Sequence, residues 1–192
     1  MEFIFATHNP NKVVEICSLL GENMHIISLD EAGLYEDIPE PYDTIEANAG
    51  EKSSVIYRLT GKDCFSEDTG LEVDSLHGAP GVHSARYAGP QKSAGDNVAL
   101  LLQNMLGKKD RRAQFRTVIS LFLHGQEYQF EGISRGAITL VPSGDNGFGY
   151  DPVFIPDGSD HTFAEMDLNE KNKFSHRAKA FSKLYAFLKE KS

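Results

Sequence analysis

Two adjacent carboxylates, Glu67 and Asp68, are followed by a hydroxyl and a glycine in Glu67-Asp68-Thr69-Gly70. The apolar run at residues 63–66 predicts a short strand, which places the acidic pair at its end. Neighbouring strand residues point to opposite faces, so only one carboxylate faces a given site. That carboxylate suits Mg²⁺, which prefers one or two carboxylates and completes its shell with water and phosphate oxygens. Glu40, in an acidic proline-rich loop, is a candidate second ligand, although a capped turn would also explain the motif.

The loop from Thr7 to Lys12 has side chains suited to binding an anion. It follows an apolar run and precedes a predicted helix, so the Thr7 hydroxyl, the Asn9 amide and the Lys12 ammonium meet at a helix N-terminus. Such an end attracts anions because its first N–H groups lack partners and the helix dipole favours negative charge. An Asn-capped helix with a surface lysine is the alternative. The glycine and lysine pattern of a Walker-type phosphate loop is absent from the sequence.

A glycine-rich segment at residues 146–152 places Phe148 between two glycines. Glycine lets the backbone approach a flat ligand, and an aromatic face can stack on a nucleobase. The segment therefore suggests a base-binding loop. An irregular loop filled by core aromatic residues would have the same composition.

Basic side chains occur where the last helix is expected to begin, in Ser175-His176-Arg177. Ser175 is a natural N-cap. His176 and Arg177 then lie in the first turn, where positive charge opposes the helix dipole. Stability alone would not select this arrangement, so these donors suggest a ligand rich in acceptor atoms. A basic surface pair that the helix tolerates is the alternative.

Regular segments alternate along the chain and would position these motifs. Strands are predicted where residues are apolar or alternate, and helices where apolar residues recur with a helical period. The predicted strands are 2–6, 24–29, 63–66, 113–123 and 128–140, and the predicted helices are 10–20, 44–59, 96–106 and the segment after Ser175. Gly21 is expected to end the first helix, and residues 124–127 to form a hairpin. This order predicts an α/β fold with a mixed sheet, most simply as two lobes around a cleft.

Composition narrows the partners and the location. The 192 residues suffice for a single domain, and the formal charge of −9 disfavours nucleic acid and anionic membrane as partners. Cys17 and Cys64 are expected to be small buried side chains and form no disulfide framework. The N-terminus has neither a basic region nor a long apolar stretch, so we expect a cytoplasmic protein without a signal peptide or membrane span.

Taken together, the motifs resemble the inosine triphosphate pyrophosphatase family, which hydrolyses noncanonical purine nucleoside triphosphates. The resemblance covers nearly the whole chain, with its motifs in the right order. It is carried by Phe5-Ala6-Thr7-His8-Asn9 with Lys12, Glu40 ahead of Asn48-Ala49 and Lys52, Glu67-Asp68-Thr69-Gly70-Leu71, residues 78–87, Gly147-Phe148-Gly149-Tyr150-Asp151-Pro152, and Glu170-Lys171 with Ser175-His176-Arg177. His8 stands where many relatives have glycine, which bears on how closely the loop packs on phosphate.

The resemblance implies a two-lobed α/β fold, with a central mixed β-sheet flanked by helices and a cleft between the lobes. It also implies a homodimer that requires Mg²⁺ and hydrolyses ITP, dITP and XTP between the α and β phosphates. By position, Asp68 is the general base and a metal ligand, and Glu40 is the second acidic ligand. The implied nucleotide-binding residues are Thr7, His8, Asn9, Pro10, Asn11, Lys12 and Lys52 for the phosphates, and Thr69, Phe148, Gly149, Tyr150, Asp151, Lys171, His176 and Arg177 for the rest of the nucleotide.

Hydrogen-bond donors offer a way to select the base. Hypoxanthine and xanthine carry an acceptor oxygen at position 6, where adenine has an amino group, and arginine has only donors. If His176 and Arg177 point at position 6, adenine leaves donors unpaired at a cost of about 1–3 kcal/mol per buried group. No contact that would exclude guanine is evident in the sequence.

Two other functions stay open. One is a related pyrophosphatase for modified pyrimidine or other odd nucleotides. The other is a nucleotide-binding regulatory module without catalysis, which the presence of both Glu40 and Asp68 disfavours.

Overall fold

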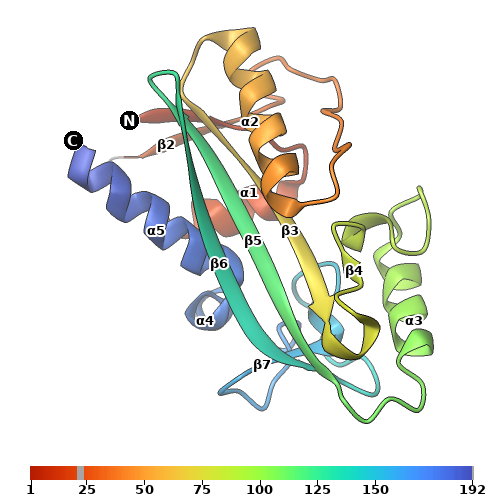
Figure 1. Ribbon diagram of the computed structural model, residues 1–192. Coiled ribbons are helices and arrows are strands. Elements are labelled where there is room, and N and C mark those ends of the chain that lie inside the picture. The colour runs from red at the N-terminus through yellow and green to blue at the C-terminus, as the bar shows by residue number, and fades with distance from the viewer. Residues whose placement is uncertain (21–23, 192) are drawn as a thin grey trace. The chain divides into compact units, whose positions relative to one another are not determined.

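The computed structural model describes residues 1–20 and 24–191, and Gly21, predicted to end the first helix, lies outside them. Helices and strands alternate early in the chain, and two long strands follow (Figure 1). The strands are β1 (Glu2–Phe5), β2 (His25–Ser28), β3 (Cys64–Val73), β4 (Pro80–Gly81), β5 (Arg112–Leu123), β6 (Gln126–Ile138) and β7 (Phe154–Pro156). The α-helices are α1 (Pro10–Cys17), α2 (Ile45–Thr60), α3 (Ala94–Asn104), α4 (Leu168–Phe174) and α5 (His176–Lys191), and the 3-10 helices are η1 (Asp74–Leu76), η2 (Ser84–Arg86) and η3 (Asp151–Val153).

The strands of the described residues form one seven-stranded sheet in the order β2-β1-β3-β5-β6-β7, with β4 paired to β3. β1 is parallel to both β2 and β3, with Phe5 opposite Phe65. β4 is antiparallel to β3, and β7 is antiparallel to β6. The sheet is therefore mixed and is flanked by helices, which confirms the predicted α/β class.

The chain divides into two compact units. Unit 1 comprises Met1–Asp68, Thr117–Gly132 and Arg177–Ser192, and unit 2 comprises Thr69–Arg116 and Ile133–His176. β3, β5 and β6 each contribute residues to both units. The single domain over residues 1–192, and the two lobes with their cleft, stay predictions.

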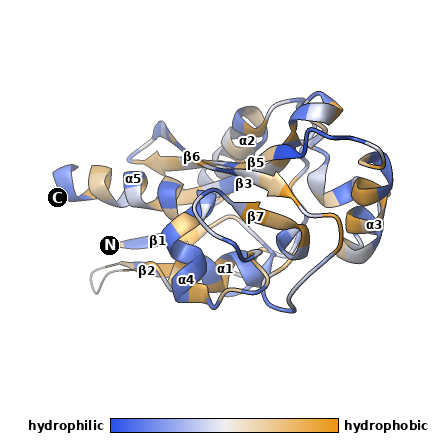
Figure 2. Ribbon diagram, turned by 90° about the horizontal axis from the view of Figure 1, so that it is seen from below, coloured by the Kyte–Doolittle hydropathy of each residue, from blue (hydrophilic) through white to orange (hydrophobic). Residues whose placement is uncertain are grey.

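In unit 1, alternating strand side chains contribute to two separate buried layers. Phe5 of β1 and Phe65 of β3 stack with ring centroids 4.5 Å apart and pack with α1 and α5. Ile4 and Cys64, one residue earlier in each strand, pack with α2. Figure 2 shows α1 and α2 on opposite sides of the strands. Successive residues of β3 therefore face α1 and α5, or α2, in turn.

The core of unit 2 joins β3, α3 and β5 to the segment that follows β6. Phe115 of β5 packs edge-on against Phe154 of β7, with ring centroids 4.8 Å apart. Tyr150 is 4% exposed, and its hydroxyl donates a hydrogen bond to the carbonyl oxygen of Ser84 (2.8 Å). Tyr150 therefore anchors the loop that carries Phe148 in this core, two residues after Phe148.

The structure corrects the predicted end of the third strand. β3 continues to Val73, so Glu67 and Asp68 lie in the interior of the strand. Leu71 and Val73 continue its buried pattern, and pairing with β4 extends it. Glu67 and Asp68 therefore point to opposite faces of the strand, whereas a turn would not require this.

Both cysteines were expected to be buried, and the structure confirms this for Cys64 but not for Cys17. Cys64 is buried, and burial raises the pKa of its thiol to about 12. Cys17 is exposed, because α1 buries Glu15 and Ile16 and the next position turns outward. No helix among residues 1–20 and 24–191 has both the length and the apolar character needed to cross a membrane.

Candidate active site

The N-terminus of α1 has the polar loop and cap that the sequence predicts. The Asn9 side-chain oxygen accepts hydrogen bonds from the N–H groups of Asn11 (3.0 Å) and Lys12 (3.4 Å), and Pro10 occupies the first turn. The Thr7 hydroxyl accepts a hydrogen bond from the N–H of Asn9 (3.1 Å). These bonds hold the loop in one conformation at a helix end that favours negative charge.

His8 connects this loop to the acidic segment after β2. Its Nδ1 lies 3.2 Å from a carboxylate oxygen of Asp30, and its Nε2 lies 3.3 Å from the carbonyl oxygen of Glu36. Glu40 follows four residues later in the same segment. His8 therefore links the loop before α1 to the segment that carries the second predicted acid.

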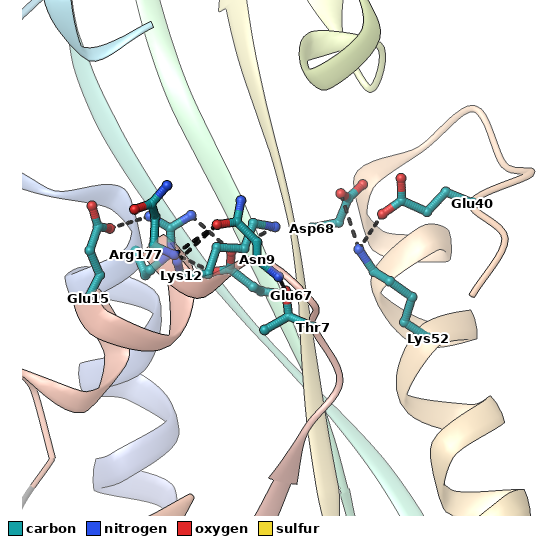
Figure 3. A network of polar contacts seen from close by, with 10 residues as sticks. Thr7, Asn9, Lys12, Glu15, Glu40, Lys52, Glu67, Asp68 and Arg177 are labelled. Atoms are coloured by element: carbon teal, nitrogen blue, oxygen red, sulfur yellow. Dashed lines mark hydrogen bonds and ion pairs between the residues drawn. The ribbon is translucent and has the colours of Figure 1, made fainter. Parts of the chain in front are cut away.

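Glu67 is bound by cations from two helices (Figure 3). Its carboxylate lies 2.9 Å from the Lys12 ammonium and accepts two hydrogen bonds from Arg177, at 2.7 and 2.9 Å. Arg177 also donates to Glu15 through Nη1. Burial raises the pKa of Glu67, but Arg177 and Lys12 outweigh burial, so the pKa lies well below its usual range. Glu15, Glu67 and Arg177 of this network are buried.

Asp68 points to the other side of β3, where it meets a cation of α2 (Figure 3). The Lys52 Nζ lies 3.5 Å from Oδ1 of Asp68 and 2.5 Å from Oε1 of Glu40. Burial lowers the pKa of Lys52, but Asp68 and Glu40 outweigh it, so the pKa is raised and the ammonium stays charged. Strand alternation thus separates the adjacent acids as predicted, and the fold brings Glu40 to Asp68.

In unit 2, Asp151 and Lys171 form a buried ion pair with an N–O distance of 2.6 Å. Asp151 also accepts a hydrogen bond from the backbone N–H of Phe148 (2.8 Å), and the Lys171 Nζ lies 5.2 Å from the Phe148 ring centre. Gly147 has φ 72°, and a Cβ there would collide with the Asp151 carboxylate. Glycine is therefore required on this side of Phe148, as its pattern in the sequence suggests.

The His176 ring is held by aromatic residues of unit 2. It stacks on Phe115 with ring centroids 4.6 Å apart and an interplanar angle of 15°. Phe163 lies 6.3 Å from the His176 ring and 5.3 Å from the Lys171 Nζ, so it contacts both predicted nucleotide-binding residues. His176, Phe163 and Lys171 therefore form one continuous group with Phe148 and Asp151.

The predicted site residues divide between the units. Unit 1 holds Thr7, His8, Asn9, Pro10, Asn11, Lys12, Glu40, Lys52, Asp68 and Arg177, and unit 2 holds Thr69, Phe148, Gly149, Tyr150, Asp151, Lys171 and His176. Thr69 is half-buried in β3, and the Tyr150 side chain belongs to the core. Arg177 is 1% exposed and donates to two carboxylates, so its role in reading a base stays a prediction.

Comparison with known proteins then gives the family. The model of the Ham1 family matches residues 3–187. The chain belongs to the Ham1 family. This Ham1 chain is 51% identical over 188 residues to a dITP/XTP pyrophosphatase of Flavobacterium johnsoniae, and the match covers 98% of each protein.

Solved structures of other Ham1 proteins have the same fold. The Staphylococcus aureus Ham1 protein has a TM-score of 0.90 at 36% identity, covering 100% of both chains. A HAM1 protein from Coxiella burnetii also has a TM-score of 0.90, at 34% identity and 99% coverage of each chain. The family model and the solved structures therefore both match nearly the whole chain.

In this Ham1 protein, Glu40 and Asp68 share the Lys52 ammonium. Across residues 1–20 and 24–191, no three His, Cys, Asp or Glu side chains are grouped so that they could hold a metal ion. Mg²⁺ needs no such group, because it takes one or two carboxylates and fills its shell with water and phosphate oxygens. The donor set therefore fits Mg²⁺ bound together with a polyphosphate, whereas structural zinc would need four protein ligands.

Three residues at the site were missed from sequence alone. Glu15 follows Lys12 by three positions, which places both on one face of α1, and this spacing could have revealed it. Phe115 and Phe163 had no such signal, because their approach to His176 depends on how distant segments pack.

Proposed function

We propose that this Ham1 protein hydrolyses the noncanonical purine nucleoside triphosphates ITP, dITP and XTP to the monophosphate and pyrophosphate. The observation that carries the proposal is the convergence of Glu40 and Asp68 on one buried cation. The substrate class is supported by the relative named dITP/XTP pyrophosphatase. Asp68 carries the chemistry, because the neighbouring acid, Glu67, is already neutralised by two cations.

Residues of unit 1 act on the triphosphate. The loop from Thr7 to Lys12 and the ammonium of Lys52 bind phosphate oxygens. Mg²⁺ held by Glu40 and Asp68 would supply neutralisation of phosphate charge and polarisation of a water molecule. Asp68 orients the attacking water and accepts its proton while the water oxygen bonds to phosphorus and the α–β bridge breaks. Pyrophosphate leaves, and no covalent intermediate with the protein is involved.

Residues of unit 2 act on the rest of the nucleotide, together with Arg177. The Phe148 ring offers a stacking surface. Gly149, Tyr150 and Thr69 are assigned to the same role by the resemblance to the pyrophosphatase family. His176 and Arg177 donate to the 6-oxo group of the base. Glu15 and Glu67 hold the guanidinium of Arg177 in place. An amino group at position 6 leaves these donors unpaired, at about 1–3 kcal/mol per buried group.

The test is pyrophosphate release across a nucleotide panel, with and without Mg²⁺. The panel contains ITP, dITP, XTP, GTP, ATP and modified pyrimidine triphosphates. We expect release from ITP, dITP and XTP to exceed release from ATP by roughly tenfold or more, and only with Mg²⁺ present. Equal rates for ITP and ATP would overturn the proposed base selection, and absence of release from every purine would overturn the proposed reaction.

The proposal also includes a homodimer that works in the cytoplasm, as the resemblance to the pyrophosphatase family implies. Sedimentation velocity should give twice the chain mass of 21.2 kDa. A species of the single-chain mass at micromolar concentration would contradict the dimer without affecting the reaction.

A further inference from the structure

Lys52 lies where the proposed function places Mg²⁺. Its Nζ contacts Oε1 of Glu40 at 2.5 Å and Oδ1 of Asp68 at 3.5 Å. Glu40 comes from the segment between β2 and α2, Asp68 from β3 and Lys52 from α2 (Figure 3). Three separate elements therefore meet at a single ammonium group.

The two carboxylates need a cation whether or not a metal is bound. Two carboxylates that lie close together in a partly buried site repel each other. A nearby positive charge offsets this repulsion. The side chains of Lys52 and Asp68 are only 9% and 11% exposed. The Lys52 ammonium, which contacts both carboxylates, supplies the compensating charge.

A divalent cation bound between Glu40 and Asp68 would compete with the Lys52 ammonium for the same two carboxylates. Mg²⁺ approaches carboxylate oxygens to roughly 2.0–2.1 Å, and a second positive charge within a few ångströms is strongly repelled. We propose that metal entry displaces Lys52 from Glu40 and Asp68, and that the displaced ammonium moves to a phosphate oxygen of the nucleotide. This inference rests on the proposed function, because it concerns the same metal and the same triphosphate.

Cooperative binding follows from this exchange. Metal alone leaves a buried ammonium without its counter-ions, and triphosphate alone meets two carboxylates and an ammonium that is already engaged. Lysine has a flexible four-carbon stem and three rotatable donors, so Lys52 can turn from a carboxylate to a phosphate. Each ligand therefore raises the affinity for the other, and the coupling is reciprocal.

Lys12 provides a matched comparison in the same unit. It also pairs with a carboxylate, Glu67, at 2.9 Å. Arg177 holds that carboxylate through two further hydrogen bonds, so Glu67 keeps a cation when Lys12 is replaced. Lys12→Gln therefore changes the net charge as Lys52→Gln does, but leaves the ammonium between Glu40 and Asp68 in place.

The test measures Mn²⁺ binding to the full chain without nucleotide, by electron paramagnetic resonance of the unbound ion. We expect Lys52→Gln to bind Mn²⁺ roughly tenfold more tightly than the unmodified protein, with Lys52→Arg close to the unmodified protein and Lys12→Gln within about twofold of it. Lys52→Met retains the apolar stem and serves if the glutamine variant does not fold. Adding Asp68→Asn to Lys52→Gln should remove the gain. Circular dichroism checks that each variant is folded.

Three outcomes separate this inference from the function on which it rests. Mn²⁺ affinity in Lys52→Gln no higher than in Lys12→Gln would overturn the exchange and leave the proposed reaction intact. Unchanged Mn²⁺ affinity in Asp68→Asn would instead remove the metal site from the proposed function. For the second ligand, Mn²⁺ should strengthen binding of α,β-imido-ITP less in Lys52→Gln than in the unmodified protein. Equal strengthening in the two proteins would overturn the coupling.

Discussion

At the scale of residues, the neighbouring acids Glu67 and Asp68 have the same charge but different surroundings. Glu67 is bound by Lys12 and twice by Arg177, so its charge is fully compensated inside the protein. Asp68 shares one ammonium with Glu40. We therefore assign stability to Glu67 and chemistry to Asp68.

Replacement of Asp68 tests the chemical assignment. Asp68→Asn keeps the shape of the side chain but removes the proton acceptor, so turnover of ITP should fall by roughly 10²–10⁴-fold. Affinity for α,β-imido-ITP should change far less, measured by calorimetry. Asp74→Asn, an exposed acid in η1, is the matched control and should keep its turnover. Full activity in Asp68→Asn would exclude Asp68 as the base.

Replacement of Glu67 tests the structural assignment. Glu67→Gln leaves Lys12 and Arg177 without their shared carboxylate, which should lower the free energy of unfolding at pH 7 by about 3–5 kcal/mol. Urea denaturation followed by circular dichroism measures the change. Glu190→Gln, at an exposed position of α5, should have almost no effect.

The lowered pKa of Glu67 predicts how the stabilising effect of this residue changes with pH. The folded pKa of Glu67 is held below its unfolded value, which is about 4.3 for a glutamate. Its stabilising contribution is therefore complete above that pH and is lost as the pH falls toward the folded pKa. The difference in unfolding free energy between the unmodified protein and Glu67→Gln should shrink below about pH 4.3. A difference that grows on acidification would contradict the assignment.

At the scale of elements, a tight turn sets the pairing of the two longest strands. His124 and Gly125 join β5 to β6 with φ values of 50° and 83°. Two successive positive φ angles are typical of a type I′ hairpin turn, which matches the twist of the strands. The hairpin predicted around residues 124–127 is confirmed, and the turn fixes which residues of β5 and β6 face each other.

Alanine substitutions at two glycines test this turn. Gly125→Ala forces an L-residue into the left-handed region and brings its Cβ to 3.2 Å from the Tyr57 hydroxyl, so it should destabilise the fold by about 1–2 kcal/mol. Gly95→Ala lies in α3 with open space around the Cβ and should stabilise by about 0.5–1 kcal/mol. Urea unfolding midpoints compare the two variants. Equal effects of the same sign would mean that the turn does not require glycine.

At the scale of the whole molecule, β3, β5 and β6 contribute residues to both compact units. We infer that the continuity of these strands couples the unfolding of one unit to the unfolding of the other. The fold should therefore melt as one cooperative domain over the whole chain.

Coincident unfolding curves test this expectation. The chain has 7 tyrosines and no tryptophan, and both units contain tyrosines, such as Tyr57 in unit 1 and Tyr150 in unit 2. We expect tyrosine fluorescence and far-UV circular dichroism to give the same midpoint in urea. Two separate transitions would show that the units unfold independently and would contradict the single domain.

Much of the fold was predictable from local pattern. The strand at residues 2–6, the Asn9 cap and the hairpin turn depend on side chains close in sequence, and all three are confirmed. The mixed sheet followed from the order of these elements. The end of β3 was not predictable, because pairing with β4 extends the strand beyond its apolar run.

The sequence by itself determined which chemical groups are present and that adjacent acids in a strand face opposite ways. Strand geometry alone forces Glu67 and Asp68 apart. Only the tertiary structure decided their partners, because Arg177 lies 110 positions from Glu67 along the chain, and Glu40 meets Asp68 through Lys52 of α2. Ion pairs over such separations depend on how helices pack on the sheet, which local sequence does not encode.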